Sequence, residues 1–338
     1  MKAIYLVRHA AASRSFEFRE EAIPVPRHSD VVIKTICSGL NFADIMVRKN
    51  LYDGAPKLPA VIGFDACGTI TAVGAEVKNF KPGDVVVALC KFSGYAEYIC
   101  TPASGVAKIP EHIDPHDAVA LAVQYLTAYY AAAKLTQLQE GDKVLIHAGA
   151  GGLGRALIQY ALFKKCIVFA TAGSEEKITM LKNMGVHHPI NYYTSDFAKD
   201  VARLTNQKGL DVVFDGIGGS NARKSFKSLA TGGRLVLHGA SVLSSGNLFS
   251  KIFQFLSFGL YHPVMLMMPS KSILGINMLE MADHKPEFIS QMLSEVIQLT
   301  VSGIFKPETP HRFPAADIAE AHAFLENRKS SGKVCIVW

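Results

Sequence analysis

The segment Lys143–Gly154, KVLIHAGAGGLG, constrains the fold of this chain more than any other. After Lys143 it has three consecutive apolar residues, Val144 to Ile146, as in a strand that is buried on both faces of a parallel sheet. Gly149, Gly151, Gly152 and Gly154 follow where a helix with an apolar face begins. Bare amides at a helix start attract an anion, and the pyrophosphate of a dinucleotide has the right charge. A glycine turn without any ligand is the alternative.

The region around this turn alternates between strand and helix patterns. A helix that contains Thr127 is expected over 118–135, before the turn. Strands separated by helices form parallel βαβ units with right-handed crossovers. The pattern therefore predicts an α/β fold with a doubly wound parallel sheet of the dinucleotide-binding type. After the turn we expect strands at 166–170, 188–191, 211–215, 234–238 and 272–278, and helices at 175–184, 195–204 and 221–229.

Short β-type runs separated by Pro and Gly occupy the first 122 residues, which is typical of a partly open barrel or sandwich. The final run, 334–338, has the character of one more buried strand, so we expect the tail to return to this region. The early runs are 2–7, 31–36, 66–73, 85–89 and 97–101. The loops between them, where a pocket would form, are expected to carry Asn41, Asp44, Tyr52, Phe64, Asp65 and Phe92.

Length and composition restrict the remaining classes. A chain of 338 residues favours two domains, each with its own core. The net charge is +6, but Lys and Arg are scattered, which argues against nucleic acid as a partner. The six cysteines form no CxxC pair, and the apolar run before Arg8 is too short for a secretory signal. We therefore expect a cytoplasmic protein.

The segment 248–269, LFSKIFQFLSFGLYHPVMLMMP, is unusually apolar for an otherwise ordinary sequence. Lys251, Gln254, His262 and Pro263 interrupt it, so it does not supply the ~20 consecutive apolar residues of a membrane span. A buried helix or a hydrophobic cover over a pocket is the first interpretation. A weak monotopic membrane contact or a dimer surface is the second.

The residues after the second strand of the sheet favour NADPH over NADH. An NAD-specific site has Asp or Glu at the tip of this strand, to accept from the ribose 2′-OH. Here the strand ends in TAGS, and Ser174, Lys177 and Tyr192 are expected to hold a 2′-phosphate. Glu175 and Glu176 would repel the phosphate unless their side chains turn outward to favour the helix dipole. For Lys177 the alternative is a solvated helix lysine.

Several motifs in this order resemble the medium-chain dehydrogenase/reductase superfamily from end to end. They are NFADIMVRKNLY, LTAYYA, HAGAGGLG, TAGSEEK, INY, DVVFDGIGG, GGRLVLHGA and SGKV. The chain looks like the zinc-free quinone oxidoreductase (zeta-crystallin-like) branch, and the region after Gly239 is similar to vesicle amine transport protein-like members. The resemblance implies a GroES-like β-rich catalytic domain from 1–122 and 279–338, a Rossmann domain from 123–278 inserted in it, and a cleft where nicotinamide meets substrate.

The resemblance also implies roles for individual residues. Asn41 and Tyr52 match positions beside the reacting ring, where either would donate a hydrogen bond to the acceptor oxygen. For Tyr52 an aromatic wall is an equal alternative, and for Asn41 a cap of loop amides. The implied cofactor contacts are Thr127 at the nicotinamide, Ala150, Gly151, Gly152 and Leu153 at the pyrophosphate, Asn277 and Lys333 from later strands, and, less distinctively, Gly219 and Ser241.

Departures from the zinc alcohol dehydrogenases of the family imply that no metal is bound. Asn41 stands where those enzymes have a zinc cysteine, and their GHE becomes Gly63-Phe64-Asp65. The third ligand position falls near Val123 or Gln124. Zinc needs about three Cys, His or carboxylate ligands. A zinc alcohol dehydrogenase would be reconsidered only if purified protein held stoichiometric metal.

The expected activity is hydride transfer from NADPH to a quinone or an α,β-unsaturated carbonyl compound, because no Lewis acid is available to polarise an alcohol. The competing hypothesis is an NADPH-binding regulatory or membrane-associated protein with little turnover, suggested by 248–269 and the vesicle-protein resemblance. The resemblance further suggests a homodimer through the sheet edge near 234–238 and 272–278.

Overall fold

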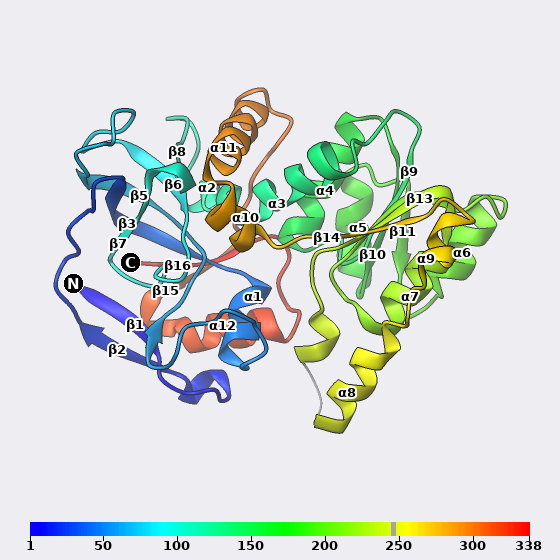
Figure 1. Cartoon of the computed structure of the whole chain (residues 1–338), viewed down its shortest axis with the longest axis horizontal. Coiled ribbons are helices and arrows are strands. Elements are labelled where there is room, and N and C mark those ends of the chain that lie inside the picture. Colours follow the sequence, from blue (N-terminus) through cyan, green and yellow to red (C-terminus); the bar gives the residue numbers. More distant parts are fainter. Residues whose placement is uncertain (245–247) are drawn as a thin grey trace. The chain divides into compact units, whose positions relative to one another are not determined.

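The structure is a computed structural model that describes residues 1–244 and 248–338, without the side chains of 248–251 and 255. The chain forms two compact units. The first comprises Met1–Leu126 and Met278–Trp338, so both chain ends belong to it, and the second is Thr127–Asn277 (Figure 1). The divisions predicted from the sequence are 122/123 and 278/279.

The second unit is built on a six-stranded parallel sheet with the order β11-β10-β9-β12-β13-β14. The first strand of this unit along the chain, β9, lies in the middle of the sheet. The next two, β10 and β11, extend the sheet to one edge, and β12, β13 and β14 extend it to the other, as in a dinucleotide-binding fold. The predicted doubly wound sheet is therefore confirmed. The strands are β9 (Lys143–Ile146), β10 (Ile167–Ala172), β11 (His188–Asn191), β12 (Leu210–Asp215), β13 (Leu229–Leu237) and β14 (Ser272–Gly275).

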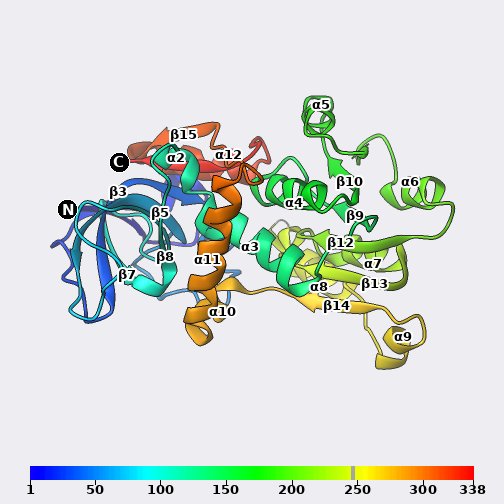
Figure 2. The same ribbon diagram turned by 90° about the horizontal axis from the view of Figure 1, so that it is seen from above.

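Alternating side chains of the central strand β9 explain why helices cover both faces of the sheet. Leu145 joins a buried cluster with Phe197 of α6 and Phe226 of α7, while its neighbours Val144 and Ile146 point to the opposite face. Figure 2 shows α4 and α6 on opposite sides of the strands. The helices are α3 (Leu126–Tyr129), α4 (Gly152–Phe163), α5 (Glu175–Asn183), α6 (Phe197–Leu204), α7 (Gly219–Lys227), α8 (Leu248–Ser257) and α9 (Pro263–Met267).

The first unit contains a small sheet, β2-β1-β4, and a larger one with the path β15-β16-β3-β5-β6-β8, in which β7 also pairs with β3. The terminal strand returns here as predicted, because β16 pairs with β3 in antiparallel register. The strands are β1 (Lys2–Leu6), β2 (Phe16–Glu20), β3 (Asp30–Leu40), β4 (Ala60–Val61), β5 (Asp65–Val73), β6 (Val85–Leu89), β7 (Tyr98–Pro102), β8 (Val106–Lys108), β15 (His311–Pro314) and β16 (Val334–Val337).

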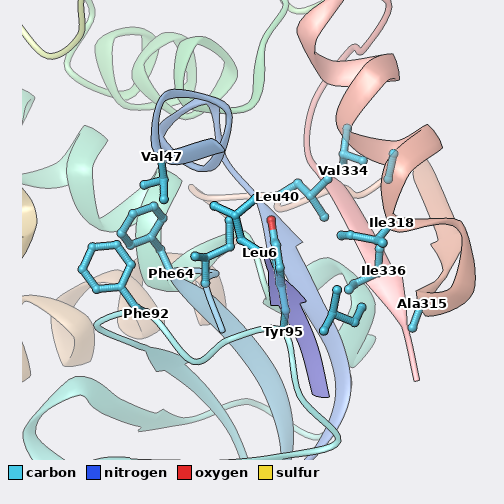
Figure 3. Packing of buried hydrophobic residues seen from close by; sticks show 13 residues of the cluster. Leu6, Leu40, Val47, Phe64, Phe92, Tyr95, Ala315, Ile318, Val334 and Ile336 are labelled. Carbon is cyan, nitrogen blue, oxygen red and sulfur yellow. The ribbon is translucent and has the colours of Figure 1, made fainter. Parts of the chain in front are cut away.

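The core of the first unit joins residues from both ends of the chain. Phe64 and Phe92 lie together below Val47, while Val334 and Ile336 of the C-terminal strand pack into the same cluster (Figure 3). Helices for which the sequence analysis made no prediction, α11 and α12, cover this unit. The helices are α1 (Phe42–Arg48), α2 (Pro115–Ala118), α10 (Met278–His284), α11 (Pro286–Val301) and α12 (Ile318–Glu326).

Three local expectations need correction. The helix expected over 118–135 is interrupted by π-helical turns at Leu121–Tyr125 and Tyr130–Leu135. The last strand of the second unit ends at Gly275, because α10 begins at Met278. Asp44 and Asp65 were expected on loops where a pocket would form, but they lie in α1 and β5 and are fully buried.

Candidate functional site

The glycine turn leads from β9 into α4, and the residues at the start of α4, Gly151 and Gly152, have no side chains. Gly151 is the N-cap of α4, and as a glycine it brings no side chain over the first amides of the helix. At Gly154 an added Cβ would lie 2.5 Å from the carbonyl oxygen of Ala148, so the close approach of helix and turn requires glycine there. Of the predicted pyrophosphate contacts, Ala150 is buried, while Gly151, Gly152 and Leu153 are half-buried. This geometry suits an anion.

A buried hydrogen-bond network that the sequence analysis did not single out supports the turn. His147 Nδ1 lies 3.1 Å from Thr171 Oγ1 and its Nε2 lies 3.0 Å from Ser225 Oγ. Ser225 in turn donates to Asp215 Oδ2 at 3.0 Å. Burial lowers the pKa of His147, which favours the neutral ring. The network ties β9, β10 and β12 together at their carboxyl ends, where dinucleotides bind in such sheets.

Of the three residues predicted to hold a 2′-phosphate, Ser174 and Tyr192 lie at the carboxyl end of β10, and Lys177 lies in the first turn of the helix that follows, α5. The Ser174 side chain caps α5 by accepting from the Lys177 N–H at 3.3 Å, which leaves its own hydroxyl hydrogen as a donor. The Tyr192 hydroxyl lies directly over Gly173, where no Cβ would fit. Lys177 is half-buried, and burial lowers the pKa of its ammonium while Glu176 opposes this. A hydroxyl and a phenol thus lie at the end of β10, next to the first turn of α5, which carries Lys177.

The two carboxylates of α5, Glu175 and Glu176, interact with different residues. Glu175 Oε1 accepts from Asn191 Nδ2 at 2.5 Å, so this side chain is directed to the end of β11. The negative charge of Glu176 raises the pKa of Lys177. Both lie in the first turn of α5, where negative charge favours the helix dipole.

The remaining predicted cofactor residues belong to other parts of the second unit. Thr127 is its first residue and Asn277 its last. Gly219 and Ser241 lie close to one another, since the Ser241 N–H donates to Gly216 at 3.1 Å and an added Cβ at Gly219 would be 3.3 Å from Val242. Their contact with a cofactor stays a prediction.

In the first unit, three neighbouring strands bring together Asn41, Asp65 and Lys333. Asn41 follows β3, Asp65 begins β5 and Lys333 precedes β16. The Lys333 ammonium donates to Asn41 Oδ1 at 2.9 Å and to Asp65 Oδ2, and Asn41 Nδ2 donates to Asp65 Oδ1 at 2.8 Å. Lys333 and Asp65 are 0% exposed. The side chain of Lys333, predicted at the cofactor, is thus engaged within the first unit.

Asp44 adds a second buried carboxyl group beside this cluster. Its Oδ2 accepts from the Asn41 N–H at 2.7 Å, which fixes the start of α1. Burial raises the pKa of Asp44 to about 8, and the neighbouring Asp65 carboxylate adds to the increase. Burial also raises the pKa of Asp65, opposed by Lys333. At neutral pH Asp44 is therefore mostly protonated, so it adds little negative charge beside the Lys333–Asp65 ion pair.

Asp44→Asn should remove a pH-dependent loss of stability. The folded-state pKa of about 8 lies above the unfolded value of about 4, so the unfolded chain releases a proton that the native protein keeps. The free energy of unfolding therefore falls as pH rises between these values. In urea titrations, the decrease from pH 5 to 7.5 should be smaller in the variant, by about 3 kcal/mol at most. The exposed Asp53→Asn should behave as wild type, and identical slopes in all three proteins would refute the assignment.

Tyr52 of the first unit packs against two phenylalanine rings, Phe64 and Phe92. Its ring centroid is 5.6 Å from that of Phe64 and 6.4 Å from that of Phe92. Burial raises the pKa of its phenol, so the hydroxyl keeps its proton and remains a donor. The structure therefore accommodates both interpretations of Tyr52, a hydrogen-bond donor and an aromatic wall.

The residues at the zinc positions of the related alcohol dehydrogenases do not fit a zinc ion. Asn41 and Asp65 already bind the Lys333 ammonium, and Phe64 replaces the intervening histidine. A fixed cation on these oxygens competes with any metal. Across the described ranges, no group of three or more His, Cys, Asp or Glu side chains is placed to hold a metal ion.

Comparisons with known proteins match both units. Residues 27–111 match the family model of the alcohol dehydrogenase GroES-like domain, and residues 152–299 match that of the zinc-binding dehydrogenases. The human synaptic vesicle membrane protein VAT-1 homolog is 32% identical over 94% of this chain and 81% of that protein.

Solved structures show the same architecture over essentially the whole chain. Escherichia coli quinone oxidoreductase, crystallised with NADPH, superimposes with a TM-score of 0.89 at 25% identity and covers 100% of both chains. The CurK enoyl reductase superimposes with a TM-score of 0.86 at 26% identity, covering 99% of each chain. These proteins are similar to this chain in fold, and two of the names describe reductases.

Proposed function

The chain belongs to the medium-chain dehydrogenase/reductase superfamily, and from this premise we propose that it is a zinc-independent, NADPH-dependent reductase of quinones or α,β-unsaturated carbonyl compounds. The observation that carries the proposal is the Lys333 ammonium bound to Asn41 and Asp65, because it takes up the groups that a zinc enzyme would use for its metal. The membership itself makes the protein an oxidoreductase.

The second unit is proposed to bind NADPH. The glycine turn at Gly151 and Gly152 presents backbone amides to the pyrophosphate, and Ser174, Lys177 and Tyr192 bind the 2′-phosphate. The quinone oxidoreductase with the same fold was crystallised with this cofactor. When bound, NADPH supplies a hydride, that is, one hydrogen nucleus with two electrons.

The first unit is proposed to bind the acceptor through Asn41 and Tyr52. Addition of hydride to an electron-poor acceptor leaves negative charge on its carbonyl oxygen, which hydrogen-bond donors stabilise. A proton from solvent then completes the product, so that a quinone plus NADPH plus one proton gives a hydroquinone and NADP⁺. An enone gives the saturated carbonyl compound with the same balance.

A panel of acceptors tests this proposal. Purified protein is mixed with NADPH, or with NADH as control, and with quinones, enals, enones and simple alcohols plus NADP⁺. We expect oxidation of NADPH with at least one quinone or enone and no alcohol oxidation. Turnover with alcohols alone, or with none of these compounds, would refute the proposed activity.

A second candidate function, a membrane-associated NADPH-binding protein with little turnover, rests on the segment 248–269. Phe258, Tyr261 and Leu266 pack against the core cluster of the second unit. In contrast, Phe253 is 73% exposed and Leu256 is 69% exposed. The side chains of 248–251 and 255 lie outside the described residues. None of the helices in the described ranges is long and apolar enough to span a bilayer.

The sequence around this segment is basic. Between Asp215 and Glu280 it contains six Arg and Lys residues and no Asp or Glu, although Lys224 and Arg234 pair with Asp196 and Asp142 from other segments. The basic residues are Arg223, Lys224, Lys227, Arg234, Lys251 and Lys271. Exposed Phe253 and Leu256, in a stretch of sequence that is basic, favour the surface of an anionic membrane.

Vesicle co-sedimentation tests this second candidate. The protein should sediment with vesicles that contain phosphatidylserine and much less with pure phosphatidylcholine, because the basic residues need negative charge. Phe253→Ser combined with Leu256→Ser should abolish sedimentation. Phe163→Ser, which removes a 48% exposed Phe from α4, is the matched control. Equal recovery of all variants in the supernatant would remove the membrane function.

A homodimer through β14 is also proposed. This strand is the edge of the parallel sheet, and an exposed edge presents unpaired backbone groups to a second copy. Exposed Met267 and Met268 precede it and extend the surface. Light scattering should give twice the chain mass, and a monomer at micromolar concentration would contradict the proposal.

A further inference from the structure

We propose that Lys333 and Asp65 are positioning residues, which hold the side-chain amide of Asn41 in one orientation and present its second N–H to the carbonyl oxygen of the acceptor. This inference rests on the proposed reductase function. It assigns Lys333 a task within the first unit in place of a cofactor contact.

The chemistry of its partners fixes the Asn41 amide without ambiguity. An ammonium only donates hydrogen bonds and an ionised carboxylate only accepts them. Because Lys333 Nζ lies 2.9 Å from Oδ1 and Asp65 Oδ1 lies 2.8 Å from Nδ2, the amide cannot be flipped without losing both bonds. One N–H goes to Asp65. The second has no partner among the described residues and remains to donate to a ligand.

The backbone around the amide is held just as firmly. Asn41 is the N-cap of α1, and its own N–H donates to Asp44 at 2.7 Å. In the sheet, Gly39 pairs with Asp65 on one side and with Cys335 on the other. A Cβ at Gly39 would overlap both Lys333 and Asp65, so glycine is required for the ion pair to lie over this strand. Lys333 and Asp65 therefore fill the space over Gly39.

Stability alone does not account for this ion pair. Both residues are 0% exposed, and burying two charges costs solvation that their attraction seldom exceeds. Replacement of such a pair by apolar residues of similar volume is often neutral or stabilising. An orienting role explains why the charges are present. The ammonium on Oδ1 also polarises the amide, which strengthens its N–H as a donor.

The step that this donor assists is hydride addition to the acceptor. As a carbon–hydrogen bond forms at the acceptor carbon, the π-electron pair moves to the carbonyl oxygen, and Asn41 donates a hydrogen bond to that oxygen. Asn41 keeps its proton, and solvent supplies the proton of the product. A donor fixed before the reaction requires no reorientation as charge develops.

The test separates orientation from stability. We expect Lys333→Met to lower the melting temperature and to reduce kcat/KM for the acceptor about 10- to 100-fold. Lys333→Met combined with Asp65→Leu, which leaves no uncompensated charge, should recover the melting temperature but not kcat/KM. The dissociation constant of NADPH should stay at the wild-type value in both. Arg48→Met, which breaks the ion pair between the buried Arg48 and the half-buried Glu326, controls for destabilisation of the same unit.

Several results would overturn the inference. Recovery of kcat/KM together with the melting temperature in the double variant would give the ion pair a purely structural role. An equal loss of kcat/KM in Arg48→Met would do the same. A large increase in the NADPH dissociation constant of Lys333→Met would place Lys333 at the cofactor instead.

A readout without turnover keeps this inference separate from the proposed function. In protein labelled with ¹⁵N-asparagine, the Asn41 side-chain signals are identified by their loss in Asn41→Ser. We expect them to move toward the shifts of exposed asparagines in the double variant. Unchanged signals would refute the fixed amide, whatever the activity. If they move but wild type reduces no acceptor of the panel, the proposed function fails while the orientation of Asn41 stands.

Discussion

Gly154→Val should abolish NADPH binding, raising the dissociation constant by at least about 100-fold, or about 2.7 kcal/mol. A Cβ at this position would lie 2.5 Å from the carbonyl oxygen of Ala148, and the two further methyl groups of valine would push α4 away from the turn. The helix amides would then no longer converge on the pyrophosphate. Fluorescence titration with NADPH measures the effect directly.

Gly275→Ala is the control for this substitution. It lies in the same unit, and an added Cβ there meets no atom within 4 Å. Its NADPH affinity should equal that of wild type. Circular dichroism must show that Gly154→Val keeps its fold. Wild-type affinity in a folded Gly154→Val protein would mean that the cofactor does not bind at the glycine turn.

Lys177→Ala should remove the preference for NADPH over NADH. Hydrogen bonds to charged groups contribute about 1.5–3 kcal/mol, so loss of the ammonium should raise the Michaelis constant for NADPH about 10- to 100-fold. NADH, which lacks the 2′-phosphate, should be affected little. The ratio of kcat/KM for the two cofactors is therefore the quantity to measure.

Lys182→Ala is the matched control, because Lys182 is an exposed lysine on the same helix, α5. It changes the net charge by the same amount without touching the corner formed by Ser174 and Tyr192. If Lys182→Ala and Lys177→Ala alter the cofactor ratio equally, the effect is long-range electrostatics and the 2′-phosphate site is refuted.

Most of the fold was accessible from the sequence because it depends on local patterns. The apolar run of β9 and the glycines after it predict a strand, a turn and a helix from adjacent residues, and the structure has these elements in that order. The C-terminal strand was likewise evident from five consecutive residues, 334–338. Helices α11 and α12 were not predicted, although α11 begins with Pro286 and buries Ile289, Met292, Leu293 and Val296 at helical spacing.

The Asn41, Asp65 and Lys333 cluster was not accessible in the same way. Lys333 is separated from Asp65 by 268 positions in the chain, and only the order of β16, β3 and β5 in the sheet brings them together. Charged residues are seldom fully buried, so a sequence pattern places Asp44 and Asp65 on loops. Comparison with the zinc positions of alcohol dehydrogenases pointed to Asn41 and Asp65. Only the structure shows that the cation bound to them is the Lys333 ammonium.

One measurement tests the central claim most directly. The protein is dialysed against a chelator, its metal content is determined, and initial rates of NADPH and NADH oxidation are compared with the best quinone or enone of the panel. We predict full activity without metal and a kcat/KM for NADPH at least about 10-fold above that for NADH. Activity that is lost on chelation and restored by zinc, or an equal preference for the two cofactors, would contradict the account.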